Sequence, residues 1–199
     1  MLTRFKEQIQ SILKAEAKIL HSVGMTPNKI SILAILFAVI ASCLYLTWRV
    51  NQVYILLAAF CFLVSGLLDA LDGAVARLYG EATAIGGFLD SLLDRYAEAF
   101  VIIAIMIAGL CNPFWGAVTL VGSLLVSYSR ARAEVAGVKM ETMGIAERAE
   151  RMIIIAIGSF LTPLNFEALS WCIIILAVLT HFTVLHRSYF FYKKSKQEA

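Results

Sequence analysis

Four aspartates stand close together in an otherwise apolar part of this sequence. Asp69 and Asp72 are three residues apart, and Asp90 and Asp94 are four residues apart. On a helix, residues at these spacings project from the same face. Apolar sequence long enough to lie in a bilayer flanks each pair, and ionisable groups in such segments are costly and usually mark a functional site. Two such faces placed opposite each other would form a cage of four carboxylates.

A cage of this kind predicts bound divalent cations, because four like charges at short range would otherwise repel one another. Hard oxygen ligands suit Mg²⁺, with Mn²⁺ as a substitute. Mg²⁺ takes few carboxylates and completes its shell with water and substrate phosphate, so we expect two ions held against a pyrophosphate. The expected metal ligands are Asp69, Asp72, Asp90 and Asp94.

Small residues and an arginine accompany the aspartates. Gly73 follows the first pair directly, and Gly86 precedes the second pair. Because glycine has no Cβ atom, both positions allow a ligand or another helix to come close. Arg77 lies one turn beyond the first pair, where it can meet a phosphate group.

The whole segment 68–95 resembles the signature of the CDP-alcohol phosphatidyltransferase family. The matching pattern is Asp69-x2-Asp72-Gly73-x2-Ala76-Arg77-x8-Gly86-x3-Asp90-x3-Asp94. The resemblance implies a six-helix membrane enzyme that moves a phosphatidyl-type group from a CDP-activated lipid to an alcohol and releases CMP. It also implies that Asp94 is the catalytic base that takes the proton of the acceptor hydroxyl.

The same resemblance assigns residues to the CDP-lipid. The positions that match family contacts are Asn28, Lys29, Ile30, Ser31, Gly73, Arg77 and Thr83. Without the resemblance, residues 28–31 indicate only the start of a helix after a proline. The family also implies a homodimer, and the lipid donor is either CDP-diacylglycerol or CDP-archaeol.

The arginines of the C-terminal half indicate the acceptor. Arginine binds phosphate through a planar bidentate fork, so a cluster of them predicts an acceptor that is itself a phosphate ester. The candidates are Arg130, Arg132, Arg148 and Arg187. Segments 127–134 and 147–151 resemble those of phosphatidylinositol-phosphate synthases and their archaeal counterparts, which implies inositol 1-phosphate as the acceptor. The alternative is that these arginines only touch lipid phosphates at the membrane surface.

Composition and hydropathy place all of these residues in a polytopic membrane protein. The chain has 199 residues, of which 60% are hydrophobic and 16% charged, and its mean hydropathy is +0.81. A bilayer span needs about 20 apolar residues. The apolar runs predict spans at 30–48, 54–77, 85–110, 114–132, 145–161 and 165–187. The expected fold is therefore all-α, with one domain over 1–199 and a six-helix bundle over 30–187.

Two segments flank the predicted bundle. Residues 1–24 alternate apolar residues and lysines at helical spacing, which predicts an amphipathic helix lying in the membrane interface. They lack the pattern of a cleavable signal peptide. Residues 188–199 are expected to form a basic cytoplasmic tail. Because the loops on the opposite side hold only Arg49 as a basic residue, the positive-inside rule predicts that both termini and the active site are cytoplasmic, in the cell membrane.

Two alternatives remain open at the level of sequence. Glycerol 3-phosphate also carries a phosphate, so the arginines accommodate a phosphatidylglycerophosphate synthase with the same cage. A cation transporter could use the aspartates as a binding site, but such folds often contain inverted repeats, and the sequence shows no internal repeat. The four cysteines are scattered singly through apolar runs, so neither a disulfide nor a zinc site is expected, and no nucleic acid partner is indicated.

Overall fold

The structure is a computed structural model that describes residues 13–140 and 144–198. The described residues form helices joined by turns, with no strand among them. A short helix over 13–22 precedes six longer ones. These are α2 (Pro27–Leu46), α3 (Val53–Tyr79), α4 (Ala84–Ile107), α5 (Pro113–Val135), α6 (Arg148–Leu161) and α7 (Ala168–Glu198).

Local sequence signals set the helix ends around the aspartates. α3 stops at Gly80, which takes a left-handed φ of 69° that other residues rarely adopt. α4 starts after Thr83, whose hydroxyl accepts the Gly86 N–H at 3.0 Å. The turn between the two helices is therefore short. It reverses the chain so that Asp72 and Asp90 lie opposite each other.

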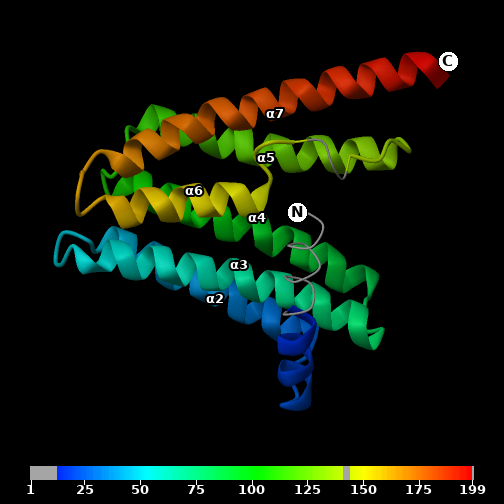
Figure 1. Cartoon of the computed structure of the whole chain (residues 1–199), viewed down its shortest axis with the longest axis horizontal. Helices are drawn as coiled ribbons and strands as arrows, with labels where there is room; N and C mark the ends of the chain where they lie inside the picture. Colours follow the sequence, from blue (N-terminus) through cyan, green and yellow to red (C-terminus); the bar gives the residue numbers. More distant parts are fainter. Residues whose placement is uncertain (1–12, 141–143, 199) are drawn as a thin grey trace.

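The six long helices form a closed ring. α2 packs against α3 and α4, α6 against α3 and α7, and α5 against α4 and α7. The order around the ring is thus α4, α2, α3, α6, α7, α5, which places α4 and α6 on opposite sides. The α3–α4 turn and the C-terminal ends of α5 and α7 lie at one end of the bundle, and the α2–α3, α4–α5 and α6–α7 connections lie at the other (Figure 1).

Three helices in the described part of the chain are long and apolar enough to cross a membrane. They are α2, α3 and the 168–196 portion of α7. α4 carries charged residues in its first half, which lowers its hydropathy. The 14 residues of α6 extend only about 21 Å at 1.5 Å per residue, less than the ~30 Å hydrocarbon core. The predicted fifth span was too long at its start, because α6 begins at Arg148 and not at residue 145. Six complete spans stay a prediction.

The flanking segments extend the fold at both ends. The basic stretch after Arg187 continues α7 as helix through Glu198. At the other terminus, the helix over 13–22 turns away from the bundle axis (Figure 1) and buries Ala17 against Ile30, Leu71 and Val75. The remainder of the predicted amphipathic helix falls on residues 1–12, outside the described residues.

The main apolar core fills the end of the bundle away from the aspartates. Tyr45 and Phe62 are fully buried there, and the Tyr45 hydroxyl lies 2.7 Å from Ser159 Oγ, which satisfies both polar groups. All four cysteines are free. Burial raises the pKa of Cys111, in the turn before α5, to about 11, so this thiol packs as an apolar group. The other half of the bundle holds most of the charged residues.

Candidate active site

Three of the four predicted metal ligands form one cluster. One carboxylate oxygen from each of Asp69, Asp72 and Asp90 lies within 4.8 Å of the others. Asp72 is only 4% exposed and accepts a hydrogen bond of 2.5 Å from Ser31 Oγ, so α2 also supports the cluster. An all-oxygen donor set with like charges at this range suits a hard divalent cation. The spacing of the aspartates therefore translates into the expected geometry for three residues.

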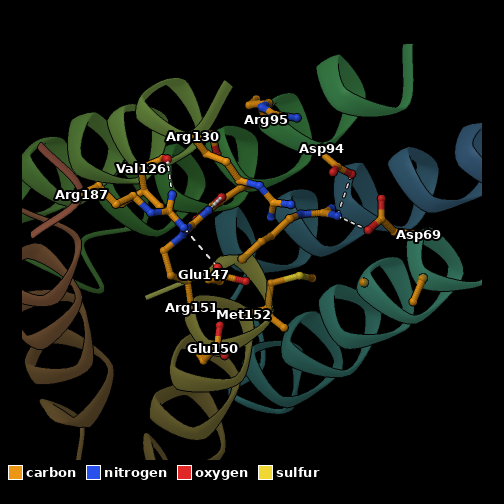
Figure 2. A pocket seen from close by; sticks show the side chains of 16 residues that line it. Asp69, Asp94, Arg95, Val126, Arg130, Glu147, Glu150, Arg151, Met152 and Arg187 are labelled. Atoms are coloured by element: carbon orange, nitrogen blue, oxygen red, sulfur yellow. Dashed lines mark hydrogen bonds and ion pairs between the residues drawn. The ribbon is translucent and has the colours of Figure 1, made fainter. Parts of the chain in front are cut away.

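Asp94 stands beside this cluster and is held differently. Arg148 Nη1 lies 2.6 Å from Asp94 Oδ1, and the same nitrogen is also ion-paired with Asp69 (Figure 2). Arg148 comes from the first turn of α6, so its guanidinium reaches across the ring to α3 and α4. The predicted fourth ligand is thus linked to the cluster through an arginine that both carboxylates share.

A cavity of about 390 Å³ opens next to the two carboxylates that Arg148 joins, lined by residues of α3, α4, α5, α6 and α7. Asp69 and Asp94 lie on one side of it, and Arg130 and Arg187 lie on the other (Figure 2). The walls therefore combine acidic groups that attract cations with arginines that attract phosphate. A ligand with a phosphate group can contact both sides.

The predicted acceptor arginines have different surroundings. Arg130 lines the cavity and donates to Glu134 at 2.9 Å. Arg187 also lines it, but its side chain is 1% exposed and donates to the Val126 carbonyl at 2.6 Å and to Glu147 at 3.1 Å. Both belong to the wall that faces the aspartates.

Arg132 does not line this cavity. It is exposed and borders a second hollow of about 310 Å³ between α5 and α7, beside Met140 and Phe191. Of the four predicted acceptor arginines, the structure thus places Arg130, Arg148 and Arg187 at one cavity and Arg132 at another, which Arg187 also lines.

Several of the predicted CDP-lipid residues gather at the same end of the bundle. Ser31 donates to Asp72, as described above, and a Cβ atom on Gly73 would stand 3.0 Å from an Arg77 guanidinium nitrogen. A Cβ on Gly86 would stand 3.4 Å from Asn28 Oδ1. Both glycines thus let polar side chains come close to the backbone near the aspartates.

The remaining predicted CDP-lipid residues have structural contacts. Lys29 is exposed and donates to the Gly24 carbonyl at 3.2 Å. Ile30 is fully buried in an apolar cluster, so its side chain is not available to a nucleotide. Thr83 caps α4 with its hydroxyl. These contacts account for Ile30 and Thr83 without a ligand.

The sequence analysis missed a buried ion pair in the wall of the cavity. Glu98 and Arg151 are 5% and 1% exposed, and Arg151 Nε and Nη2 donate to the two Glu98 oxygens at 2.5 and 2.6 Å. A signal for it existed, because Glu98 follows Asp94 by four residues in an apolar helix and a carboxylate there requires a partner.

An apolar helical bundle with a carboxylate cluster and an arginine-lined cavity defines a membrane enzyme that acts on phosphate groups. The family model for CDP-alcohol phosphatidyltransferase matches residues 24–183, and the chain belongs to this family. The transporter alternative is therefore not supported.

Relatives and solved structures agree with this assignment. Archaetidylinositol phosphate synthase of Pyrococcus horikoshii is 40% identical over 189 residues, covering 95% of each chain. The crystal structure of Mycobacterium tuberculosis phosphatidylinositol phosphate synthase (PgsA1) with CDP-DAG bound is 29% identical, with a TM-score of 0.75 over 92% of this chain and 94% of that one. The same protein with manganese and citrate gives a TM-score of 0.77 over 90% and 88%. The solved relative thus holds CDP-DAG in one structure and manganese in another.

Proposed function

We propose that the protein transfers a phosphatidyl-type group from a CDP-activated lipid to inositol 1-phosphate and releases CMP. The observation that carries the proposal is the single cavity in which Arg148 meets Asp69 and Asp94 and faces Arg130. A donor pyrophosphate at the carboxylate cluster and a phosphate on the acceptor would then lie side by side. The names of the relatives, an archaeal archaetidylinositol phosphate synthase and a bacterial phosphatidylinositol phosphate synthase, support the same acceptor.

The metal ligands in this proposal are Asp69, Asp72, Asp90 and Asp94, holding Mg²⁺ as two ions. Bound divalent cations neutralise the pyrophosphate and stabilise the charge that develops on the leaving phosphate. The carboxylates, which lie on α3 and α4, would fix where the cations and therefore the pyrophosphate bind. Ser31 holds Asp72 in one orientation through its hydrogen bond.

On the donor side, Asn28, Ser31, Gly73 and Arg77 would contact the CDP portion. Gly73 leaves room for a phosphate oxygen beside the Arg77 guanidinium, since a larger residue would crowd it. Lys29 and the backbone around Ile30 and Thr83 would complete the nucleotide contacts at the start of α2 and α4.

On the acceptor side, Arg148 and Arg130 would bind the phosphate, and the charge of Arg187 would support them from the wall. Asp94, 2.6 Å from Arg148, would take the proton of the acceptor hydroxyl as that oxygen attacks the lipid-side phosphorus. One phosphorus–oxygen bond forms to the acceptor and one breaks to release CMP, so the reaction needs no covalent enzyme intermediate. Arg132 is left outside this set because it borders another hollow.

The orientation we propose has six spans, an interfacial helix over 1–24, and both termini and the active site in the cytoplasm. The distribution of basic residues supports this orientation. The end of the bundle that holds the aspartates also holds Arg77, Arg130, Arg132 and Lys139. A cytoplasmic site would meet both CDP-lipids and soluble phosphate esters. The family resemblance supports a homodimer.

The experiment incubates purified protein with Mg²⁺ and either CDP-diacylglycerol or CDP-archaeol. Inositol 1-phosphate, glycerol 3-phosphate and free inositol are offered in separate reactions, and CMP release is measured for each. We expect inositol 1-phosphate to give the highest kcat/KM and free inositol the lowest, because only the esters can use the arginines. A higher kcat/KM for glycerol 3-phosphate or for free inositol would overturn the proposed acceptor.

A further inference from the structure

Two ion pairs cross the interior of the helix ring, and both join α4 to α6. The pair beside the carboxylate cluster is Asp94 with Arg148. The second pair, Glu98 with Arg151, lies one turn further along both helices. Glu98 follows Asp94 by four residues and Arg151 follows Arg148 by three, so each helix presents both of its charged groups on one face.

The Glu98–Arg151 pair is fully enclosed and geometrically complete. Its two parallel hydrogen bonds use the planar fork of the guanidinium. The third nitrogen, Arg151 Nη1, donates to the Ala146 carbonyl at 2.8 Å, just before α6 begins. A single side chain therefore holds the start of α6 at a set distance from α4.

Stability alone is a weak reason for such a pair. Taking two charges out of water is costly, and replacing a buried ion pair by apolar residues is often neutral or stabilising. α4 and α6 are also not neighbours in the ring, so apolar packing between them does little to set their relative position. The bidentate bond of Arg151 to Glu98 fixes the position of α6 relative to α4, which apolar packing does not do.

We propose that Glu98 and Arg151 are positioning residues for the acceptor, a role that rests on the function proposed above. The pair sets the separation of Arg148, which binds the acceptor's phosphate, from Asp94, which takes its hydroxyl proton. Glu98 and Arg151 themselves lie in the wall of the cavity, but their charged groups bond each other, so the pair acts through Arg148 and Asp94. The phosphate and the hydroxyl belong to one small rigid molecule. If α6 shifts against α4, Arg148 cannot bind the phosphate while Asp94 contacts the hydroxyl. A misplacement of about 1 Å can cost about 10²-fold in rate.

The test replaces the pair by apolar residues of similar length in the double variant Glu98→Leu/Arg151→Met. Thermal unfolding, Mn²⁺ binding by electron paramagnetic resonance, CDP-lipid binding, and kcat and KM for inositol 1-phosphate are measured. We expect unfolding at or above the wild-type temperature and unchanged Mn²⁺ and CDP-lipid binding. The value of kcat/KM for inositol 1-phosphate should fall by about 10²-fold.

A matched control removes a buried polar contact at the far end of the bundle. The double variant Tyr45→Phe/Ser159→Ala loses the hydrogen bond between α2 and α6 but leaves both ion pairs in place. Because both partners are replaced by apolar groups of similar shape, it should unfold near the wild-type temperature and keep the wild-type kcat/KM for inositol 1-phosphate. A purely structural role for Glu98 and Arg151 would leave kcat/KM for inositol 1-phosphate at the wild-type value in both double variants.

Arg151→Lys gives a second measurement if the apolar variant does not fold. Lysine keeps the charge but lacks the fork, so we expect kcat/KM for the acceptor to fall about tenfold with CDP-lipid binding unchanged. Wild-type kcat/KM in the folded apolar variant, or in Arg151→Lys when the apolar variant does not fold, overturns the proposal. Failure of the proposed acceptor looks different, because the wild type itself would then show a higher kcat/KM with glycerol 3-phosphate or free inositol than with inositol 1-phosphate. The pair would in that case be measured with the acceptor that the wild type uses.

Discussion

At the scale of single residues, the carboxylates of the cluster are held in unequal ways. Asp72 is buried and fixed by Ser31, whereas Asp69 is half-buried and shared with Arg148. A metal that binds Asp72 meets a hydroxyl partner there, whereas a metal that binds Asp69 competes with the Arg148 guanidinium. This difference makes Asp72 the cleanest place to test the metal site.

We expect Asp72→Asn to abolish both Mn²⁺ binding and CMP release, because the amide removes a ligand charge without changing the side-chain shape. Excess EDTA should have the same effect on the wild type. Electron paramagnetic resonance measures the bound Mn²⁺. Glu167→Gln, in the turn before α7, is the control and should bind and turn over as the wild type does. Full activity of Asp72→Asn would exclude the metal mechanism.

Asp94→Asn should separate binding from chemistry. A general base acts in the transition state, so its loss should reduce kcat by about 10²–10⁴-fold while the Kd for the CDP-lipid changes little. Isothermal titration and single-turnover CMP release measure the two quantities. If CDP-lipid affinity fell in parallel with kcat, Asp94 would be a ligand of the donor site and not the base.

Arg148→Ala should raise the KM for inositol 1-phosphate about ten- to a hundredfold, the cost of a lost charge-assisted hydrogen bond. Arg132→Ala is the matched control, since it removes the same charge from a neighbouring hollow. Mn²⁺ affinity should not fall in Arg148→Ala, because the guanidinium beside Asp69 repels cations. Equal effects of the two substitutions on KM would contradict the assignment.

At the scale of helices, Thr83 combines two possible tasks. As the N-cap of α4 it satisfies the Gly86 N–H, and loss of such a cap costs about 1 kcal/mol. Thr83→Ala should therefore lower the unfolding temperature, and Thr83→Ser should restore it. If Thr83 also contacts the nucleotide, the KM for the CDP-lipid should rise in Thr83→Ala more than in an equally destabilised variant. Thermal unfolding and initial rates measure the two effects.

Most helices begin and end where the sequence predicts them. Pro27, Thr83 and Asn112 mark starts, and Gly80 marks an end, through capping and backbone rules that act locally. α6 was predicted to start earlier because residues 145 and 146 continue the apolar run. The Ala146 carbonyl is instead bonded by the side chain of Arg151, a contact that no local rule contains.

The site likewise has features that local sequence predicts and features that depend on tertiary packing. The carboxylate cluster follows from spacings of three and four residues, which can be recognised in the sequence. The partners of Arg148, Arg151 and Arg187 depend on the order of helices around the ring, which only tertiary packing determines. Arg132 follows Arg130 by two residues, and residues two apart on a helix face nearly opposite directions, which accounts for their places at different cavities.

At the scale of the whole molecule, labelling in intact cells tests the number of membrane crossings. Single cysteines at Gln52 and Asn165, in a background without the native cysteines, test it with a thiol reagent that does not cross membranes. Both positions lie in connections at the end of the bundle away from the aspartates. We expect both to react in intact cells and a cysteine at Glu81 to react only after lysis. Protection of Asn165→Cys alone would mean that the short helix α6 does not cross.

The position of α6 in the ring also has a consequence for biogenesis. A ribosome making this chain releases Asp69, Asp72, Asp90, Asp94 and Glu98 well before it makes Arg148 and Arg151. During that interval, an unfinished bundle of α2, α3 and α4 carries five acidic groups and none of the arginines that later pair with three of them. The acidic faces of the nascent helices must therefore contact water or cytosolic cations until the last third of the polypeptide is synthesised and the ring closes.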